Sequence, residues 1–496
     1  MVAAGVAIGV AHLVSGIVNP QASPVITVGQ TAIDATPEWL KSWAIRTFGH
    51  NDKTVLVGGI YLVLAVVALA LGILSIRRPQ IGIVGLAVFG GIGVFAALTR
   101  PNGTPSDAVP AFAGFLAGSG AFYMLRSTWS LPEPAWNGDD PRAFDRRRFL
   151  VAGSAGVIVA VVAGATGSVL GRRFLANASR AAVAVPLPAS PATAASLIDL
   201  HVPGLEPFIT PNDRFYRVDT ALLAPAVMAE DWRLRIHGMV DRELTIGYQQ
   251  LVQRPLIERD VTLACVSNTV GGRYVGNARW IGAPLADLLL EAGVHPGADQ
   301  IVSRSVDGFT VGTPTAIAMD GRDSMLAIAM NGEPLPIDHG FPVRMIVPGL
   351  YGYVSATKWI VDIELTTFDA FDPYWVQRGW AERAPVKTMS RIDTPKPFAT
   401  VRAGNVAVAG VAWAQHRGIE RVELQVDEGP WMTAELAAED TIDTWRQWVV
   451  PWDATTGDHR LQVRATDLTG ATQPEERVHP FPNGATGWHS VVLSVT

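Results

Sequence analysis

Cysteine is the scarcest residue type in the sequence, with a single copy, Cys265, among 496 residues. One thiol cannot form an intramolecular disulfide, and it cannot build a zinc or iron–sulfur site that needs several cysteines. The sequence also lacks a CxxC pair, an HExxH motif and the CxxCH motif of covalent haem. Cys265 is therefore either an inert buried thiol or a metal ligand whose partner ligands come from a cofactor.

Charged residues are scarce as well. They make up 17% of the chain, against 49% hydrophobic residues and a mean hydropathy of +0.24. This balance is unusual for a wholly soluble protein and predicts that part of the chain lies in lipid. The net charge of -6 and the absence of a long basic run exclude attraction to nucleic acid. The length predicts two or three domains.

Five apolar stretches occupy the first third of the chain, and each is near the length of a membrane-crossing helix. Arginines follow the second and fourth stretches, which predicts that these two connections are cytoplasmic. The N-terminus is then inside, residues 19–54 form an external loop, and everything after the fifth stretch is extracytoplasmic. The stretches are Val2–Val18, Val55–Ile76, Ile81–Leu98, Ala108–Leu125 and Phe149–Leu170.

The fifth stretch follows the sequence DRRRFL at residues 145–150, which resembles a twin-arginine export signal. That route exports folded proteins, so it suits a protein that receives a cofactor in the cytoplasm. The alternative is an ordinary cluster of cytoplasmic arginines. Because no convincing cleavage site follows, we expect the helix to remain as an anchor. Residues 1–175 are thus predicted to be an all-α transmembrane region, and the alanine- and proline-rich residues 176–198 a linker.

The composition changes completely after the linker. In residues 199–394, short β-branched runs alternate with turns and with brief helical patterns such as residues 283–294, which predicts an α+β domain. In residues 395–496, segments such as Val422–Val426 and Leu461–Ala465 alternate apolar and polar residues, which predicts a β-sandwich. Four tryptophans of this last region are interpreted as core packing: Trp413, Trp431, Trp445 and Trp448.

Cys265 lies in the densest unusual segment, residues 262–289, where an apolar strand runs into a polar, glycine-rich loop and then a leucine-rich helix. A thiolate is a soft ligand for a transition metal, and glycines let the backbone approach a large ligand closely. The segment resembles the molybdenum-binding segment of the sulfite oxidase family, in which a cysteine and a short polar loop precede G-N-A-x-W-x-G, here residues 276–282.

Further blocks resemble the same family in the same order along the chain. They are TPNDRFYRVDT (210–220), MNGEPLPIDHGFPVRMIVPG (330–349) and SATKWI (355–360), and residues 410–431 and 487–495 resemble its dimerisation domain. The resemblance covers about 300 residues. It implies an α+β sulfite-oxidase-like molybdopterin domain (199–394) and a C-terminal immunoglobulin-like β-sandwich that dimerises (395–496), preceded by the transmembrane region.

The resemblance also implies roles for individual residues. Cys265 would bind the one molybdenum of a molybdopterin cofactor, and Arg217 would share in catalysis. His339 and Arg344 match a pair, five residues apart, that holds the pterin and its phosphate, although taken alone they fit a turn cap and a surface arginine. The SATK segment is one residue longer than the usual phosphate-binding pattern. The cofactor-binding residues implied are Tyr216, Arg217, Asp307, His339, Arg344, Ser355 and Lys358. Trp280 fits either core packing or a pocket wall.

The sequence departs from sulfite oxidases around the expected substrate site. Residues 266–269 (VSNT) stand where those enzymes place arginine, Val311 replaces a tyrosine, and Val218 and Asp219 follow Arg217. We therefore expect a less cationic pocket, which argues against sulfite as the substrate. The predicted reaction is two-electron oxygen-atom transfer on a small, sulfur-containing or other oxo-accepting substrate outside the membrane. The alternatives are a sulfoxide or N-oxide reductase of the same family and a non-catalytic, membrane-anchored binding or assembly protein. The electron-transfer partner is not visible in the sequence.

Overall fold

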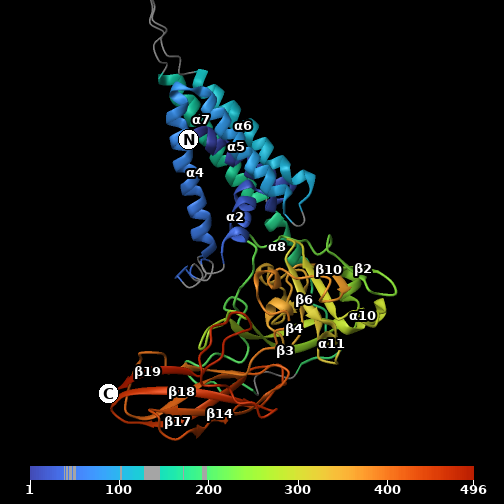
Figure 1. Cartoon of the computed structure of the whole chain (residues 1–496), viewed down its shortest axis with the longest axis vertical. Helices are drawn as coiled ribbons and strands as arrows, with labels where there is room; N and C mark the ends of the chain where they lie inside the picture. Colours follow the sequence, from blue (N-terminus) through green and yellow to red (C-terminus); the bar gives the residue numbers. More distant parts are fainter. Residues whose placement is uncertain are drawn as a thin grey trace, which may run out of the picture. The chain divides into compact units, whose positions relative to one another are not determined.

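The computed structural model describes residues 1–37, 40, 43, 47–48, 52–100, 103–127, 146–170, 172–192 and 198–496 (Figure 1). These residues form two compact units. The helical unit contains Met1–Ala178 and Thr220–Ala226, and the β-rich unit contains Ser179–Asp219 and Val227–Thr496. Asp145, the first residue of the twin-arginine-like motif, lies outside the described residues.

The helical unit places a helix at each of the five apolar stretches. Four of them are long and apolar enough to cross a membrane: Lys53–Arg77, Pro79–Leu98, Pro105–Ser127 and Phe149–Ser168. The prediction of five spans is corrected for the first stretch, whose 17-residue helix is only about 25 Å long. The helices are α1 (Val2–Val18), α2 (Pro24–Ala35), α4 (Asp52–Arg77), α5 (Pro79–Leu98), α6 (Val109–Ser127), α7 (Arg146–Leu170) and the start of α8 (Arg172–Ala182), with short 3-10 turns at Pro20–Ala22 and Pro105–Ala108.

Helix α1 packs against α6 and α7 through small residues. A Cβ atom at Gly9 would lie 2.5 Å from the carbonyl oxygen of Ala160, and one at Gly16 would lie 2.7 Å from that of Gly167. Only glycine allows backbones to approach this closely, as is common where helices meet in membranes. The short α1 therefore packs closely against longer helices along one side. The predicted external loop is also corrected, because α2 occupies part of it.

The predicted linker is partly helical and partly extended. Helix α8 continues to Ala182, because its alanines favour helix until Pro186 approaches. Beyond it, Ala189 N–H donates to Leu256 O at 2.8 Å, and Glu258 N–H donates to Ser190 O at 2.8 Å. Residues 189–190 thus lie along the edge of a strand instead of forming a free tether, whereas residues 193–197 are outside the described part of the chain.

The first part of the β-rich unit contains two sheets with short helices. One sheet has the order β2-β1-β10-β5-β6, and the other the order β3-β4-β7-β8, with β9 paired to β7. The bounds are β1 Arg233–Gly238, β2 Leu244–Gly247, α9 Tyr248–Val252, β3 Ile257–Ala264, β4 Val275–Pro284, α10 Leu285–Ala292, β5 Gln300–Ser305, β6 Thr310–Pro314, α11 Thr315–Ala318, β7 Met325–Met330, β8 Glu333–Pro334, η5 Ile337–His339, β9 Arg344–Ile346, η6 Gly352–Val354, β10 Ile360–Thr366 and η7 Val376–Arg378.

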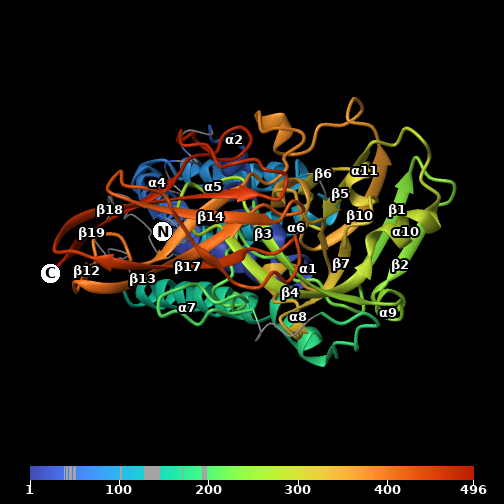
Figure 2. The same cartoon turned by 90° about the horizontal axis from the view of Figure 1, so that it is seen from below.

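The remaining strands form the C-terminal β-region, residues 389–496. Figure 2 shows β14 and β18 in one layer and β13 and β17 in the other. Both layers contribute to one core, in which Trp448 is fully buried between residues such as Val422 and Val463. The strands are β11 Met389–Thr394, β12 Thr400–Val401, β13 Gly404–Trp413, β14 Ile419–Val426, β15 Met432–Thr433, β16 Glu435–Leu436, β17 Arg446–Ala454, β18 Gly457–Asp467 and β19 His489–Val495.

The boundary predicted at residue 395 is corrected by strand β11. This strand pairs with β13, with Met389 opposite Trp413, so it belongs to the C-terminal β-region. Residues 389–394 carry the charged residues Arg391 and Asp393, both buried, which disguise a core strand in the sequence. Trp413, Trp445 and Trp448 are buried in the β-rich unit, which confirms their interpretation as packing residues, whereas Trp431 is only half-buried and packs edge-to-face against Trp488.

Candidate active site around Cys265

Cys265 directly follows β3 and begins a closed loop. Its N–H donates to Tyr274 O at 2.9 Å, and its carbonyl accepts from Asn268 N–H at 3.0 Å. The Asn268 side chain closes the loop by accepting from Tyr274 N–H at 2.9 Å. Burial raises the pKa of the Cys265 thiol, while hydrogen bonds from Ser267 oppose that rise. The described residues contain no group of three or more histidine, cysteine, aspartate or glutamate side chains that could hold a metal.

Two tyrosines accompany Cys265. Burial raises the pKa of Tyr216, and the negative charge of a Cys265 thiolate raises it further. Burial also raises the pKa of Tyr351 to about 12, again with a contribution from Cys265. Tyr216 stacks on Phe215 with ring centroids 5.2 Å apart. Both phenols therefore stay protonated at neutral pH and lie within electrostatic reach of Cys265. Tyr351 was not predicted from the sequence.

Arg344 is a buried cation with few partners. It begins β9, lies over the ring of Trp280 at 5.1 Å and donates to His339 O at 3.2 Å and to Ala356 O at 3.4 Å. Its Nε has no hydrogen-bond partner among the described residues. Burial lowers the pKa of Arg344 to about 10. A charged group that is buried and incompletely hydrogen-bonded is costly, so this position favours an anion beside it.

His339 and Lys358 lie within electrostatic reach of Arg344. Burial, and then the charges of Arg344 and Lys358, lower the pKa of His339 to about 4, so its ring is neutral at pH 7. Its Nε2 lies 3.2 Å from Asn212 O and therefore carries the proton in the tautomer that this contact requires. Burial lowers the pKa of Lys358 to about 8, although Asp219 opposes the shift. Three of the implied cofactor-binding residues are thus brought together.

Arg217 joins this cluster through two aspartates. Its Nε lies 2.8 Å from Asp219 Oδ2, and its Nη1 lies 3.1 Å from Asp338 Oδ1. Lys358 Nζ shares the same Asp219 oxygen at 2.8 Å. The two aspartates therefore hold Arg217 and Lys358 in place. They were missed from the sequence, although Asp219 follows Arg217 by two residues and Asp338 directly precedes His339.

Two of the expected cofactor-binding residues, Ser355 and Asp307, make hydrogen bonds within their own turns, and Trp280 is a core residue. The Ser355 hydroxyl donates within its own turn to the carbonyls of Leu350 and Tyr351, both at 3.1 Å. Asp307 accepts from Phe309 N–H at 3.3 Å in the turn between β5 and β6. Trp280 is fully buried, donates to a β3 carbonyl and supports Arg344, so it belongs to the core beneath the site.

Two protein-family models match this chain. The oxidoreductase molybdopterin binding domain matches residues 221–375, and the Mo-co oxidoreductase dimerisation domain matches residues 382–495. Mitochondrial sulfite oxidase of Drosophila melanogaster is 32% identical over 55% of this chain and 56% of its own length. That of Mus musculus is 30% identical over 58% of this chain and 62% of its own length. The chain thus spans less than two thirds of these relatives.

A solved structure shows the same fold. The sulfane dehydrogenase SoxCD from Paracoccus pantotrophus matches 59% of this chain and 84% of its own with a TM-score of 0.51 at 24% identity. The two family models match consecutive parts of the chain, and the first match contains Cys265, Arg344 and Lys358. The chain belongs to the sulfite oxidase family of molybdopterin oxidoreductases.

Proposed function

We propose that this chain is a membrane-anchored molybdopterin oxidoreductase that catalyses two-electron oxygen-atom transfer on a small, sulfur-containing substrate. One observation carries the proposal: the chain's single thiol and the buried, incompletely hydrogen-bonded Arg344 both lie within electrostatic reach of Tyr216. A soft metal ligand and an anion-binding cation are what a phosphorylated, metal-bearing cofactor requires.

Molybdopterin fits the residues present. Cys265 would hold the metal, and Arg344, whose Nε lacks a partner among the described residues, would hold the phosphate together with Lys358. The neutral ring of His339 would face the pterin without adding a charge. Tyr216 and Arg217 complete the set, and Asp307 and Ser355 stay weaker candidates. When bound, the cofactor supplies the two-electron and oxygen-transfer chemistry.

The chain's own residues bind and orient the substrate. The protonated phenols of Tyr216 and Tyr351 can donate hydrogen bonds beside Cys265, whereas the loop after Cys265 offers Ser267 and Asn268 in place of arginine. Arg217 is already paired with Asp219 and Asp338. Such a site favours a substrate with less negative charge than the sulfite dianion. The names of the relatives, sulfite oxidase and sulfane dehydrogenase, support a sulfur compound.

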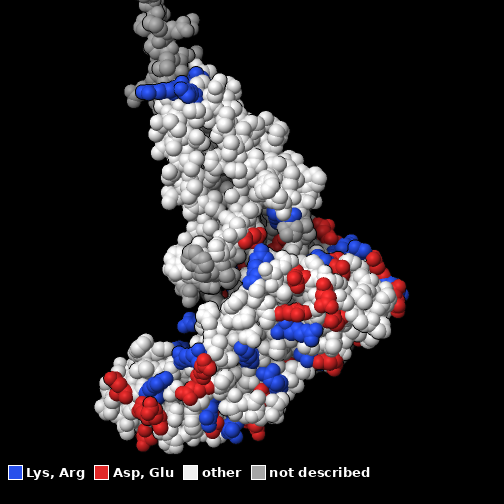
Figure 3. All heavy atoms as spheres, viewed as in Figure 1, with Lys and Arg blue, Asp and Glu red and all other residues white. Residues whose placement is uncertain are grey.

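The helical unit would anchor the enzyme in a membrane. Its visible face in Figure 3 is almost free of charge along its length. Arg77, Arg78 and Arg126 lie at helix ends that the positive-inside rule assigns to the cytoplasm. The β-rich unit would then work on the extracytoplasmic side, after export by a twin-arginine route. The match to a dimerisation domain supports a homodimer through an immunoglobulin-like C-terminal domain.

Metal and cofactor analysis of the purified full-length protein tests this proposal. We expect about one molybdenum and one pterin per chain, and oxidation of a sulfur compound with ferricyanide as artificial electron acceptor. Sulfite, thiosulfate, dimethyl sulfoxide and trimethylamine N-oxide would be compared, the last two with reduced viologen as donor. If correctly matured protein contains no molybdenum and no pterin, the proposal that it is a molybdopterin enzyme is wrong. If only dimethyl sulfoxide and trimethylamine N-oxide are converted, the enzyme is a reductase.

A further inference from the structure

The strand that leads into Cys265 has an edge that its own sheet leaves open beyond its first residues. In the sheet order β4 is the strand neighbour of β3, and residues 189–190 meet the other edge at Ile257, so alternate peptide groups further along β3 point away from the sheet. Thr262, three residues before Cys265, is one of these. Its N–H donates to Asp443 O at 3.0 Å, and its carbonyl accepts from Gln415 Nε2 at 2.9 Å. The C-terminal β-region therefore takes the place of a neighbouring strand at this point.

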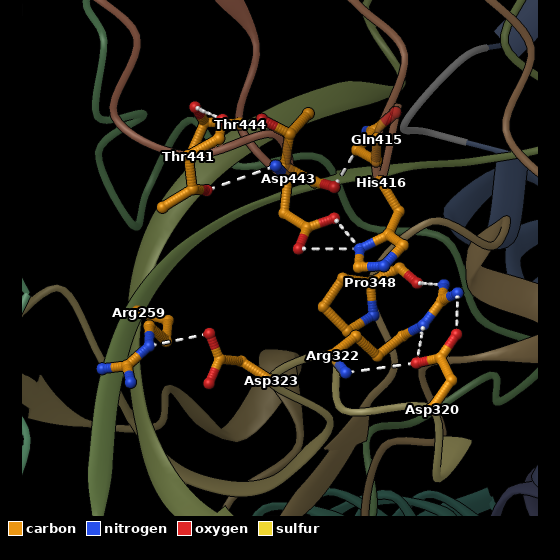
Figure 4. A network of polar contacts seen from close by, with 11 residues as sticks. Arg259, Asp320, Arg322, Asp323, Pro348, Gln415, His416, Thr441, Asp443 and Thr444 are labelled. Carbon is orange, nitrogen blue, oxygen red and sulfur yellow. Dashed lines mark hydrogen bonds and ion pairs between the residues drawn. The ribbon is translucent and has the colours of Figure 1, made fainter. Parts of the chain in front are cut away.

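The side chain of Thr262 is held by the same region. Its hydroxyl accepts from Trp445 N–H at 2.7 Å and donates to Asn277 Oδ1 at 3.0 Å. Gln415 and Thr262 are buried, so water does not replace these bonds. Asp443 also pairs with His416 at 3.2 Å, which fixes the segment that offers its carbonyl (Figure 4).

The loop after Cys265 is held from the same side. Arg391 Nη1 donates to Gly272 O at 3.0 Å, while Arg391 Nε is fixed by Asp393 at 2.6 Å. The ring of His489 lies against Gly271, where an added Cβ would come within 2.3 Å of it. Strand β11 and strand β19 of the C-terminal β-region thus close over the loop that begins at Cys265.

We propose that the C-terminal β-region positions Cys265, with Gln415 and Arg391 as its positioning residues, apart from any part it has in dimerisation. It holds the chain before Cys265 at Thr262 and after it at Gly272. The bonds inside the loop then determine where the sulfur lies. A ligand that offers one sulfur to a cofactor-bound metal has to be presented in a fixed place, and residues behind a ligand commonly do this. The inference rests on the proposed function for the role of Cys265 as ligand.

Alkylation of the single cysteine provides a direct test, because any thiol reagent reports Cys265 alone. The full-length chain is purified in detergent from cells that make no molybdopterin. Gln415→Met keeps the length of the side chain and removes its donor, and Arg391→Met does the same at Gly272. We expect each to raise the alkylation rate about fivefold, the factor that loss of one net hydrogen bond gives.

Two variants serve as matched controls. Gln425→Met removes a similar bond, from Gln425 Nε2 to Gly429 O at 2.8 Å, in a hairpin of the same region, and should leave the rate unchanged. Arg391→Lys keeps a donor for Gly272 O and should restore most of the protection. Equal rates in Gln415→Met, Arg391→Met and Gln425→Met overturn the proposal, whether all three stay at the parent value or all three rise.

The cofactor-loaded protein gives a second readout. We expect the electron paramagnetic resonance signal of Mo(V) to shift in Gln415→Met and Arg391→Met, and molybdenum to be lost severalfold faster on dialysis. An unshifted signal together with unchanged retention in both variants contradicts the proposal. If the parent protein never contains molybdenum, the proposed function fails, while the alkylation rates still decide whether the C-terminal β-region positions Cys265.

Discussion

The helical unit exposes many of its large apolar side chains, whereas the β-rich unit buries most of its own. In the helical unit, Leu62 and Phe95 are exposed while the buried positions are small residues such as Ala11 and Gly16. In the β-rich unit, large side chains such as Trp280 are buried and charges lie outside (Figure 3). The difference is what the proposed membrane location of the helical unit predicts, since lipid does not drive large apolar residues inward and water does.

The largest predicted effect is a variant of the β-rich unit that loses activity while the helical unit still inserts into the membrane. Cys265→Ser replaces the thiolate with a harder, weaker donor, so we expect activity with every substrate to disappear, at least a thousandfold by rough estimate, and molybdenum to be lost. Insertion of the helical unit should not change. Activity assays, metal content and resistance to alkaline extraction from membranes measure the three quantities. A variant that keeps substantial turnover would show that Cys265 is no essential ligand.

A pair of leucines with the same exposure compares the two solvents directly. Leu62 in α4 is 66% exposed and Leu290 in α10 is 67% exposed. Leu62→Asp should cost about 3 kcal/mol of membrane insertion, whereas Leu290→Asp should change stability by less than about 0.5 kcal/mol. The fraction of protein that resists alkaline extraction gives the first value, and the melting temperature gives the second. Equal tolerance of both substitutions would show that α4 faces water.

Two glycines of the helical unit, one at a close helix contact and one in open space, test whether small residues are needed where its helices pack. Gly16→Leu forces a side chain against the backbone of Gly167, which would lie 2.7 Å from the new Cβ, and should destabilise the unit by about 1–3 kcal/mol. Gly91→Leu meets nothing within 4 Å and should be tolerated. Melting temperatures in detergent measure both. If the two variants melt alike, α1 is not packed against α7 through small residues.

The last predicted effect is a pH dependence that belongs to the β-rich unit and is small within any one pH unit. Burial lowers the pKa of His339 and of His489 to about 4, below the ordinary value of 6.5. Between pH 6.5 and 4 the unfolded chain therefore binds more protons than the folded chain, so stability is full above pH 6.5 and falls as the pH drops. Each histidine should contribute about 1 kcal/mol per pH unit in that window.

The variant His489→Asn tests this prediction, because an asparagine oxygen can still accept from Ile392 N–H, which lies 3.0 Å from His489 Nδ1. The melting temperature of the full-length chain in detergent should fall less between pH 6.5 and 5 than it does in the parent. Substitution of the exposed His201 by Asn is the matched control. An identical acid response in His489→Asn and the parent would rule out this histidine as a source of the effect.

Local patterns in the sequence were enough for most of the architecture. Apolar runs located the helices from Val55 onward, and period-two alternation located strands such as β14 and β18. The pattern failed in two places. Helix α1 is apolar but, at 17 residues, shorter than the four candidate spans. Strand β11 joins the C-terminal β-region, although its buried charged residues make it look polar in the sequence.

The candidate site divides in a similar way. Ordered motifs predicted Cys265, Arg344 and Lys358 as cofactor-binding residues, because residue type and spacing can be read from the sequence. Nothing in the sequence indicated that Tyr351 lies near Cys265 or that Lys358 shares Asp219 with Arg217, since Tyr351 and Lys358 are far along the chain from these partners.

The sequence by itself determined the cofactor class, the membrane anchor as an expectation and the residue types that meet in the site. Only the tertiary structure decided what holds Cys265 in place. Thr262 is bound by Gln415 and Asp443, which both lie more than 150 residues further along the chain. A hydrogen bond that involves a backbone carbonyl leaves no motif in either segment. Local periodicity reports which face of an element is buried, whereas only the folded chain shows which distant residue covers it.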